Sequence, residues 1–268
     1  MLEWARRADA AGFSTLGTLD RLVYPNHEPL VTLGAAAAVT ERIRLMTGVL
    51  LVPWRQNAAL VAKQAATVHA LSGGRFTLGA GLGSRDDDYE ASGVPTKGRG
   101  RRMDEMLAVI RRVWDGAELG YAGGVGPDVT SDPPELIVGG SADAAFRRAA
   151  EYADGWMMGG GAPERFPELS GKLETAWRER GRDGEPRKLA LTYFALGDDP
   201  QGDTERSIGD YYSFSPEYAS AVVAATAKGE DGVRERIEAF RDAGVDEVVM
   251  FPASPDPQQV DLLAAIAL

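Results

Sequence analysis

The chain has 268 residues, of which 44% are hydrophobic and 26% charged, so it can bury a large core and disorder is not expected. Its 29 basic and 40 acidic side chains give a net charge of −11, which excludes a general attraction to nucleic acid or anionic membranes. The lack of cysteine excludes disulfides and thiolate catalysis, and the two histidines leave no expected metal site. No apolar run has the roughly 18 residues of a membrane span, and we expect a cytoplasmic protein.

Helix-like and strand-like segments alternate along the whole chain. The predicted helices, in chain order, are 2–11, 29–40, 57–71, 100–114, 142–152, 163–180, 232–243 and 257–267. The predicted strands between them are 13–19, 43–52, 75–80, 135–138, 155–158, 188–196 and 247–251. Two segments interrupt this order: 116–134 is rich in Gly, Pro and Asp and reads as an irregular excursion, and 198–228 reads as a helical insertion with many aromatic residues.

The strands are near-continuous apolar runs, which indicates burial on both faces and hence a parallel sheet. The unbroken alternation predicts one α/β domain over residues 1–268. Periodicity does not separate a closed barrel from an open doubly wound sheet, but the length favours a (β/α)8 TIM-type barrel, for which about 250 residues is typical. Since the chain opens with a helix and one strand fewer than a full barrel is predicted, we expect a barrel that lacks its first strand, with a helical insertion before its last βα unit.

Polar and aromatic side chains gather in the loops that follow the strands, which form the reactive face of a parallel barrel. Asp20 follows the first strand and is either a turn residue or an acceptor for a heterocycle. His27, in the same loop, is either a solvent-facing residue or an acid–base candidate, because the pKa of histidine lies near neutrality. His69 lies on the opposite face and is expected to be structural, and the acidic run 86–88 is expected to be solvated.

Two glycine-containing loops are candidates for binding a phosphate. The loop 139–141 joins a strand to a helix, so its free N–H groups can receive a phosphate at the helix N-terminus. The loop 159–161 follows the next strand and can complete the same cradle, although both loops are read equally well as ordinary short connections. The glycines of 79–83 have no helix directly after them, which disfavours a nicotinamide dinucleotide site.

An ordered set of short segments carries a family resemblance. The segments are 8–13 with Asp20 after it, 42–49, 62–67, 71–75, 78–81, 88–93, 98–105, 138–141, 153–156 and 243–247. Together they resemble the bacterial luciferase-like superfamily of flavin- and deazaflavin-dependent oxidoreductases, over nearly the whole chain except 116–134 and 198–228. The resemblance implies a (β/α)8 barrel that carries reduced flavin or deazaflavin on its C-terminal face.

The resemblance also implies a cofactor, FMN in its reduced form or coenzyme F420, and a non-proline cis peptide at Gly48–Val49 behind its ring. The implied cofactor-binding residues are Asp20, Gly48, Val49, Gly81, Gly83, Gly139, Gly140, Ser141, Gly159 and Gly160. The candidate substrate contacts are Tyr24, Trp54, Tyr211, Tyr212 and Phe214. The last three of these lie in the insertion, which we interpret as a lid, with a packing layer as the alternative.

The chain departs from its relatives in two places. Many relatives have Asp-His after the second strand of the barrel, whereas this chain has Asp20 and Arg21, so Arg21 either orients an anionic substrate or pairs with Asp20. Where some deazaflavin enzymes carry a Glu, this chain has Ser84. The catalytic candidates are therefore Asp20, Arg21 and His27, with no general base assigned.

Three functions remain open at this stage. The first is oxygenation of a small organic substrate by O2 with reduced FMN, the second is hydride transfer with F420 and no O2, and the third is a non-catalytic barrel. The expected partners are a small-molecule substrate and a flavin or deazaflavin reductase as supplier, and a homodimer is the assembly that the relatives suggest.

Overall fold

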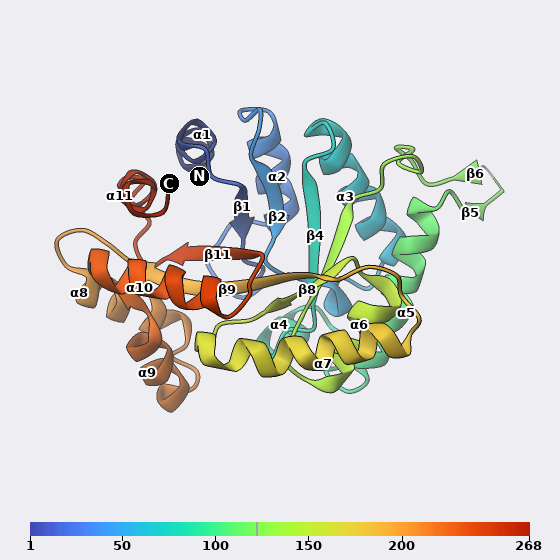
Figure 1. The fold of residues 1–268 in the computed structure, drawn as a ribbon. Coiled ribbons are helices and arrows are strands. Elements are labelled where there is room, and N and C mark those ends of the chain that lie inside the picture. The colour runs from blue at the N-terminus through green and yellow to red at the C-terminus, as the bar shows by residue number, and fades with distance from the viewer. Residues whose placement is uncertain (122) are drawn as a thin grey trace.

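The computed structural model describes residues 1–121 and 123–268, which form a curled sheet of parallel strands with most helices packed on its outside (Figure 1). The sheet runs in the order β1, β2, β4, β7, β8, β9, and β11 pairs with the other edge of β9. The main strands are β1 (Thr15–Thr18), β2 (Arg44–Thr47), β4 (Phe76–Gly81), β7 (Glu135–Gly139), β8 (Gly155–Met158), β9 (Arg187–Ala195) and β11 (Glu247–Pro252). The short strands β3 (Leu50–Leu51) and β10 (Ala227–Lys228) extend the sheet beside β4 and β9. Every predicted strand is confirmed.

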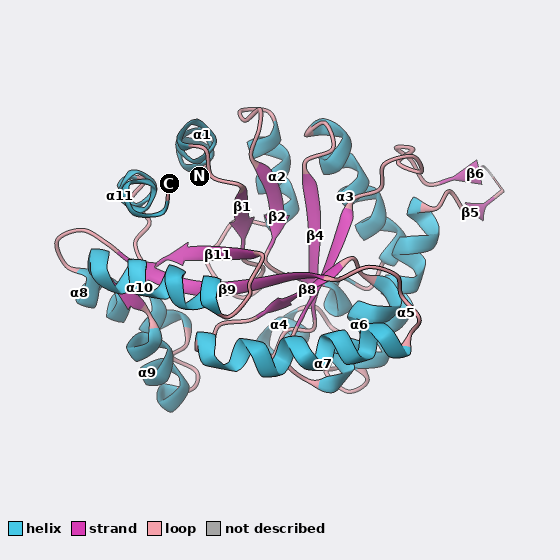
Figure 2. Cartoon of the chain, viewed as in Figure 1, coloured by secondary structure: helices cyan, strands magenta, loops and turns pink. Residues whose placement is uncertain are grey.

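The helices follow the strands as expected for a β/α architecture (Figure 2). They are α1 (Leu2–Ala11), α2 (Pro29–Ala37), α3 (Ala58–Leu71), α4 (Asp86–Ala91), α5 (Arg99–Trp114), α6 (Asp143–Tyr152), α7 (Phe166–Glu179), α8 (Pro200–Thr204), α9 (Pro216–Ala225), α10 (Gly229–Asp242) and α11 (Gln258–Ala267). Single turns of other helix types are η1 (Val52–Arg55), η2 (Pro163–Arg165) and η3 (Glu205–Gly209). Within the described residues, no helix is long and apolar enough to cross a membrane.

Local sequence determines where several of these elements begin and end. α1 ends at Gly12, whose φ of 94° lies in the left-handed region that glycine adopts without a steric penalty. The side chain of Asn57 accepts a hydrogen bond from the Leu60 amide and so starts α3. A Cβ at Gly79 would overlap the carbonyl of Thr47, so a glycine is required for β2 and β4 to approach each other.

Apolar side chains fill two layers. The larger layer lies between the strands and the outer helices and includes the fully buried Trp114 and Trp156. A second cluster joins residues of several strands, among them Met46 and Met157, with side chains of the insertion. The insertion 198–228 is therefore packed against the sheet at one end of the curl, and we call it the lid.

The barrel is open between its first and last strands. β1 pairs only with β2 and β11 pairs only with β9, and among the residues that the structure describes no ladder joins β1 to β11. A complete barrel needs eight strands. The prediction of a TIM-type barrel that lacks one strand is confirmed, and the gap lies where that strand would stand.

Two segments differ from their predictions. The excursion 116–134 contains a short antiparallel pair, β5 (Glu118–Gly120) with β6 (Gly123–Gly124), where only irregular chain was predicted. The acidic run 86–88 opens α4 instead of lying in a loop, because the three carboxylates suit the first turn of a helix. The helical character of the lid is confirmed by α8, η3 and α9.

Candidate active site

The predicted cis peptide lies at the C-terminal end of the sheet. The bond between Gly48 and Val49 is cis, which confirms the prediction. A Cβ at Gly81 would overlap the Val49 side chain, and a Cβ at Gly139 would lie a tight 3.1 Å from Val49 Cγ1, so glycine at both positions leaves room for Val49. Gly83, just beyond Gly81, has a positive φ of 71°. The start of β3 and the ends of β4 and β7 thus meet around the Val49 side chain, which we call the platform.

The N-terminus of α6 begins directly beside this platform. Its N-cap is Ala142, an extended residue whose side chain cannot accept a hydrogen bond, so the first amides of the helix keep no side-chain partner. The amide of Gly140 donates to a β8 carbonyl at 3.3 Å and joins the loops after β7 and β8. Within the described chain, the amides of Ser141, Gly159 and Gly160 have no protein acceptor. These unused donors and the helix dipole suit an anion.

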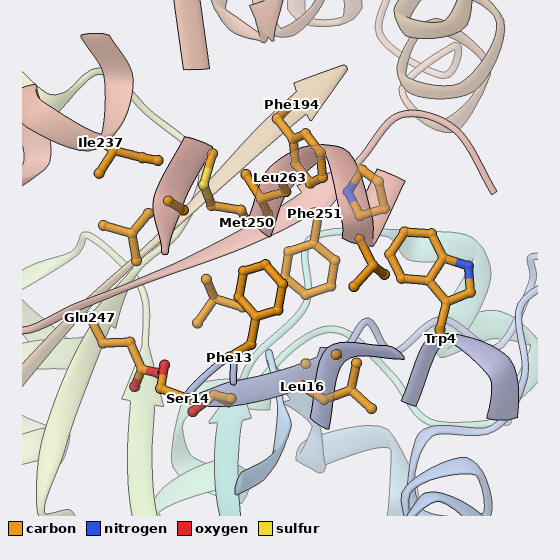
Figure 3. Close-up of a pocket in the computed structure, with 18 of the residues that line it drawn as sticks. Trp4, Phe13, Ser14, Leu16, Phe194, Ile237, Glu247, Met250, Phe251 and Leu263 are labelled. Atoms are coloured by element: carbon orange, nitrogen blue, oxygen red, sulfur yellow. The ribbon is translucent and has the colours of Figure 1, made fainter. Parts of the chain in front are cut away.

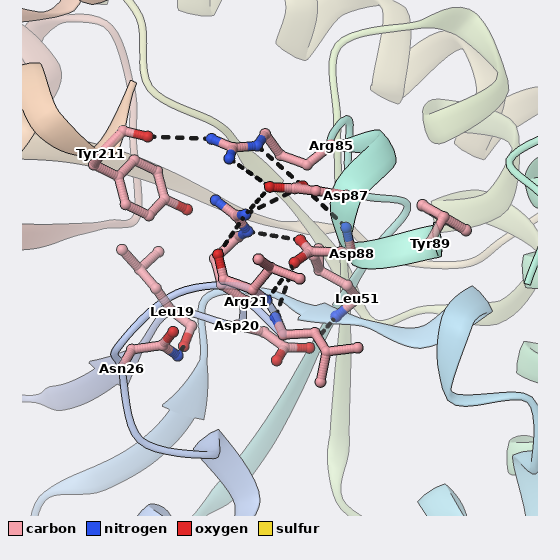
Figure 4. Close-up of polar contacts among 12 residues, drawn as sticks. Leu19, Asp20, Arg21, Asn26, Leu51, Arg85, Asp87, Asp88, Tyr89 and Tyr211 are labelled. Atoms are coloured by element: carbon pink, nitrogen blue, oxygen red, sulfur yellow. Dashed lines mark hydrogen bonds and ion pairs between the residues drawn. The ribbon is translucent and has the colours of Figure 1, made fainter. Parts of the chain in front are cut away.

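A buried ion pair holds Arg21 at the end of β1 (Figure 4). Arg21 Nε donates to Asp88 Oδ2 at 2.6 Å, and the two side chains are only 3% and 1% exposed. Arg21 Nη2 lies 3.2 Å from Asp87 Oδ2, and Asp88 Oδ1 accepts the amides of Leu22 and Val23. Of the two alternatives for Arg21, the pairing with Asp20 is wrong. The solvated reading of the acidic run is wrong for Asp88, which α4 folds inward onto the loop after β1, whereas Asp86 is exposed as expected.

Asp20 has partners of its own. Its carboxylate accepts the Leu51 amide at 2.8 Å and Arg55 Nη2 at 3.0 Å, and Arg55 also pairs with Glu28 at 2.9 Å. Burial raises the pKa of the Asp20 carboxyl above its usual value, while Arg55 and the Leu51 amide oppose that shift. The Arg55 guanidinium also stacks on Trp54, 4.6 Å from the ring centroid. Asp20 and Trp54 therefore fix the segment of β3 and η1 that follows Val49.

The aromatic residues of the lid come together over the C-terminal end of the strands. Tyr24 and Tyr211 pack edge to face at 5.0 Å, and Tyr211 and Tyr212 do so at 4.8 Å. Arg85 attaches the lid to the barrel, since it lies 3.9 Å from the Phe214 centroid and donates to the Tyr211 carbonyl at 3.3 Å. Four of the five predicted substrate contacts thus form one cluster, and Trp54 is not among the aromatic pairs.

The two histidines lie away from this cluster. His27 is exposed and borders the gap between β1 and β11, so the structure does not bring it to Arg21. His69 Nδ1 lies 3.3 Å from the Phe76 carbonyl and its Nε2 lies 3.3 Å from Asp132, at the opposite end of the sheet, as expected for a structural residue.

Sequence reasoning missed a tyrosine pair. The hydroxyls of Tyr193 on β9 and Tyr212 in the lid are 2.7 Å apart, and burial raises the pKa of both phenols. The Tyr193 ring is 3.7 Å from the place of a Cβ on Gly160, so it borders the proposed phosphate loops. The alternation of side chains along β9 could have predicted the place of Tyr193, because Leu189, Leu191 and Tyr193 share one face of the strand.

This geometry defines the class of the protein: a parallel β/α barrel with its polar and aromatic site at the C-terminal ends of the strands. Residues 1–244 match the family model described as luciferase-like monooxygenase, and the chain belongs to this family. The expectation drawn from the short segments is thereby confirmed. Family membership makes the chain a luciferase-like oxidoreductase.

Curated relatives and solved structures agree with this assignment. An uncharacterised protein of Mycobacterium tuberculosis (strain H37Rv) is 36% identical over 208 residues, 66% of this chain and 71% of that protein. The F420-dependent glucose-6-phosphate dehydrogenase of Beutenbergia cavernae is 33% identical over 180 residues, which is 60% of this chain but only 52% of the dehydrogenase.

Two solved structures share the fold. An F420-dependent secondary alcohol dehydrogenase with an F420–acetone adduct has a TM-score of 0.81 at 19% identity, covering 99% of this chain and 92% of that one. A type II Baeyer–Villiger monooxygenase from Pseudomonas putida in complex with FMN has a TM-score of 0.75 at 17% identity, covering 99% and 90%.

Proposed function

We propose that the chain binds coenzyme F420 at the C-terminal face of its barrel and transfers hydride between this coenzyme and a small organic substrate. The observation that carries the binding of a cofactor of this kind is the Val49 platform beside the uncapped start of α6, because a planar ring with a phosphate tail needs an apolar support and an anion receptor next to each other. Gly139 connects the two, since it touches Val49 and leads into α6. The dehydrogenase relative from Beutenbergia cavernae favours F420 over FMN.

The residues present fit a phosphorylated, planar cofactor. The amides of Ser141, Gly159 and Gly160 would hold the phosphate, because they have no acceptor of their own among the described residues. The start of α6 adds the positive end of its dipole, and no side chain caps it. The first turn does contain the carboxylate of Asp143, which is exposed and lies 4.0 Å from Lys172 Nζ. Val49 would support one face of the ring, since Gly81 and Gly139 leave room for its side chain between them.

When bound, a deazaflavin supplies a two-electron hydride carrier, and the chain's own residues provide binding, orientation and a proton. The lid aromatics around Tyr211 would exclude water from the site. The hydroxyl of Tyr212 is protonated at neutral pH, since the ordinary pKa of a phenol, about 10, lies well above it and burial raises the pKa further. The Tyr193 hydroxyl, 2.7 Å away, orients it. Tyr212 Oη is thus our candidate for exchanging a proton with the substrate oxygen, while the charge of Arg21 is neutralised by Asp88.

A second function is favoured by a separate observation. The chain matches a family described as monooxygenases, and a structural neighbour with a TM-score of 0.75 holds FMN. A lid that excludes water serves oxygenation with reduced FMN equally well, since reactive intermediates decay in water. The platform and the phosphate loops do not distinguish the two cofactors.

Anaerobic titration with each cofactor tests the proposal. We expect saturable binding of F420, followed by its fluorescence or absorbance, and no O2 uptake when the reduced complex meets air and an alcohol or carbonyl substrate. Tight binding of reduced FMN with O2 uptake would contradict hydride transfer with F420 and support oxygenation instead. Binding of neither cofactor would contradict both functions and leave a non-catalytic barrel.

A further inference from the structure

We propose that the site takes a neutral substrate with an apolar chain, and that four residues at its mouth hold this chain. They are Leu22 and Val23 on the loop after β1, and Phe214 and Tyr218 in the lid. We call them the apolar rim. This inference names the substrate class of the site, so it rests on the proposed function, but it holds for either cofactor.

The side chains of the apolar rim are exposed on two segments that meet at the C-terminal end of the barrel. On the loop, Leu22 and Val23 are 42% and 44% exposed, and the two lid residues are 49% and 48% exposed. Loop and lid are in contact, since the rings of Tyr24 and Tyr211 pack edge to face at 5.0 Å. Single exposed apolar residues are common on protein surfaces, whereas a group of them beside a site indicates a surface that binds apolar groups.

The apolar rim continues inward to the candidate proton donor. The ring of Tyr212 lies 5.1 Å from that of Tyr218 and 6.3 Å from that of Phe214, measured between centroids. The Tyr212 hydroxyl is 2.7 Å from that of Tyr193, which is only 7% exposed. Tyr212 and the platform residue Val49 pack against one buried cluster. Apolar surface therefore extends from the platform to solvent, as a substrate needs when its reacting group lies inside and its chain lies outside.

Carboxylates neutralise the three arginines that stand at this mouth. Their ion pairs are Arg21–Asp88 at 2.6 Å, Arg55–Glu28 at 2.9 Å and Arg85–Asp87 at 2.6 Å. Arg21 also contacts Asp87, so Asp87 lies between two guanidinium groups (Figure 4). Asp20 is a fourth carboxylate beside these three cations, so the cluster carries one net negative charge. A carboxylate or phosphate on the substrate would be repelled, which disfavours the anionic substrate that the sequence suggested for Arg21.

A separate apolar hollow lies on the side of the barrel, between β1 and β11 (Figure 3). Its volume is about 950 Å³, and Trp4, Phe13 and Met250 are among the residues that line it. Neither Tyr212 nor any residue of the apolar rim lines it. Its inner side is narrow, because Val249 Cγ1 lies 3.0 Å from the place of a Cβ on Gly17. An apolar probe can therefore bind in two places, which the test has to separate.

A series of chain lengths tests the proposal. The probes are methyl ketones of about four to ten carbons and the carboxylates of the same lengths, and isothermal titration gives the dissociation constant of each for the chain with and without its cofactor. We expect the affinity for ketones to rise about twofold or more with each methylene until the rim is covered, since full burial of a methylene corresponds to about fourfold. Each carboxylate should bind at least about tenfold more weakly than the ketone of its length.

Two substitutions locate the bound chain. Leu22→Ser and Tyr218→Ser each remove apolar surface from one side of the rim, and we expect each to weaken binding of the longest ketone by about threefold or more, and of the shortest by less than about twofold. Both side chains are exposed, so the fold should be unaffected, which urea unfolding checks. The matched control is Leu71→Ser at the end of α3, where the side chain is 65% exposed and the change should alter neither affinity.

A ketone series without a slope, or carboxylates that bind as tightly as ketones, would overturn the proposal. So would weaker binding of the longest ketone by Trp4→Ala but not by Leu22→Ser, because the probe would then lie in the hollow of Figure 3. If Leu22→Ser instead separates a dimer in sedimentation and leaves the series unchanged, the rim is an interface between copies and the proposal fails. The expected series in a chain that binds no F420 would support the rim and contradict only the proposed hydride transfer.

Discussion

At the scale of single residues, two ion pairs hold the loop after β1 in place. The Asp-His of many relatives suggested that Asp20 and Arg21 are catalytic candidates. In this chain Arg21 forms an ion pair with Asp88, and Asp20 forms one with Arg55. Removing only one partner of a buried ion pair lowers the stability of the fold strongly, since the other charge is then buried without compensation. Arg21 and Asp88 are therefore positioning residues for the loop and for the lid above it.

Removing the carboxylate of Asp88 tests this interpretation. We expect Asp88→Asn to lower the free energy of unfolding by about 3 kcal/mol, because it leaves Arg21 buried with less compensation. The control is Asp86→Asn in the same helix, where the side chain is exposed and the change should stay within about 0.5 kcal/mol. Urea unfolding measures both, and equal values for the two variants would show that the buried ion pair does not stabilise the loop.

Asp87 predicts a dependence on pH. The hydrogen bond from Arg85 lowers the pKa of the Asp87 carboxyl, so its folded-state value lies below its unfolded-state value. The stabilisation is thus present above the unfolded pKa of about 3.9 and is lost as the pH falls through the lowered folded pKa. In thermal melts between neutral and acid pH, Asp87→Asn should lose less stability than the unmodified chain. Parallel curves for the two would contradict this.

At the scale of elements, a short backbone ladder and several side-chain contacts join the lid to the barrel. The Tyr193–Tyr212 hydroxyl pair links β9 to the lid, and Arg85 links it to the start of α4. Because Tyr193 is buried and the Tyr212 hydroxyl is its described partner, removing one hydroxyl leaves the other unsatisfied. Removing one hydroxyl is therefore expected to weaken the packing of the lid against β9.

A double-mutant cycle on the tyrosines separates packing from hydrogen bonding. Tyr212→Phe should destabilise the chain by about 1–2 kcal/mol because the Tyr193 hydroxyl stays buried without a partner. The double variant Tyr193→Phe with Tyr212→Phe should be closer to the unmodified chain than the single variant is, since no polar group is then left alone. Additive losses in urea unfolding would mean that the two hydroxyls do not interact.

At the scale of the whole molecule, much of the architecture could be predicted from the sequence. Apolar runs located every main strand, and the count of seven such runs predicted a sheet one strand short of a closed barrel over residues 1–268. The cis bond at Gly48–Val49 followed from the family resemblance alone. The burial of Asp88, its pairing with Arg21 and the contact of Tyr193 with the lid were missed, because each depends on how a short helix or the lid docks, which local patterns do not encode.

The account as a whole depends on a phosphorylated cofactor bound at the start of α6. Ala142→Asp tests this most directly, because an N-cap carboxylate would place a negative charge beside the phosphate loops and repel a phosphate while it caps the helix. The control Ala142→Asn caps the same amides without a charge. The measurement is the dissociation constant of F420 and of FMN by anaerobic titration, alongside urea unfolding of each variant.

For Ala142→Asp we expect at least about tenfold weaker cofactor binding, equal to 1.4 kcal/mol or more, together with stability that is unchanged or about 1 kcal/mol higher. Ala142→Asn should lose less affinity than the aspartate variant. If the aspartate variant binds the cofactor as tightly as the unmodified chain does, the account is contradicted, since the phosphate must then lie elsewhere.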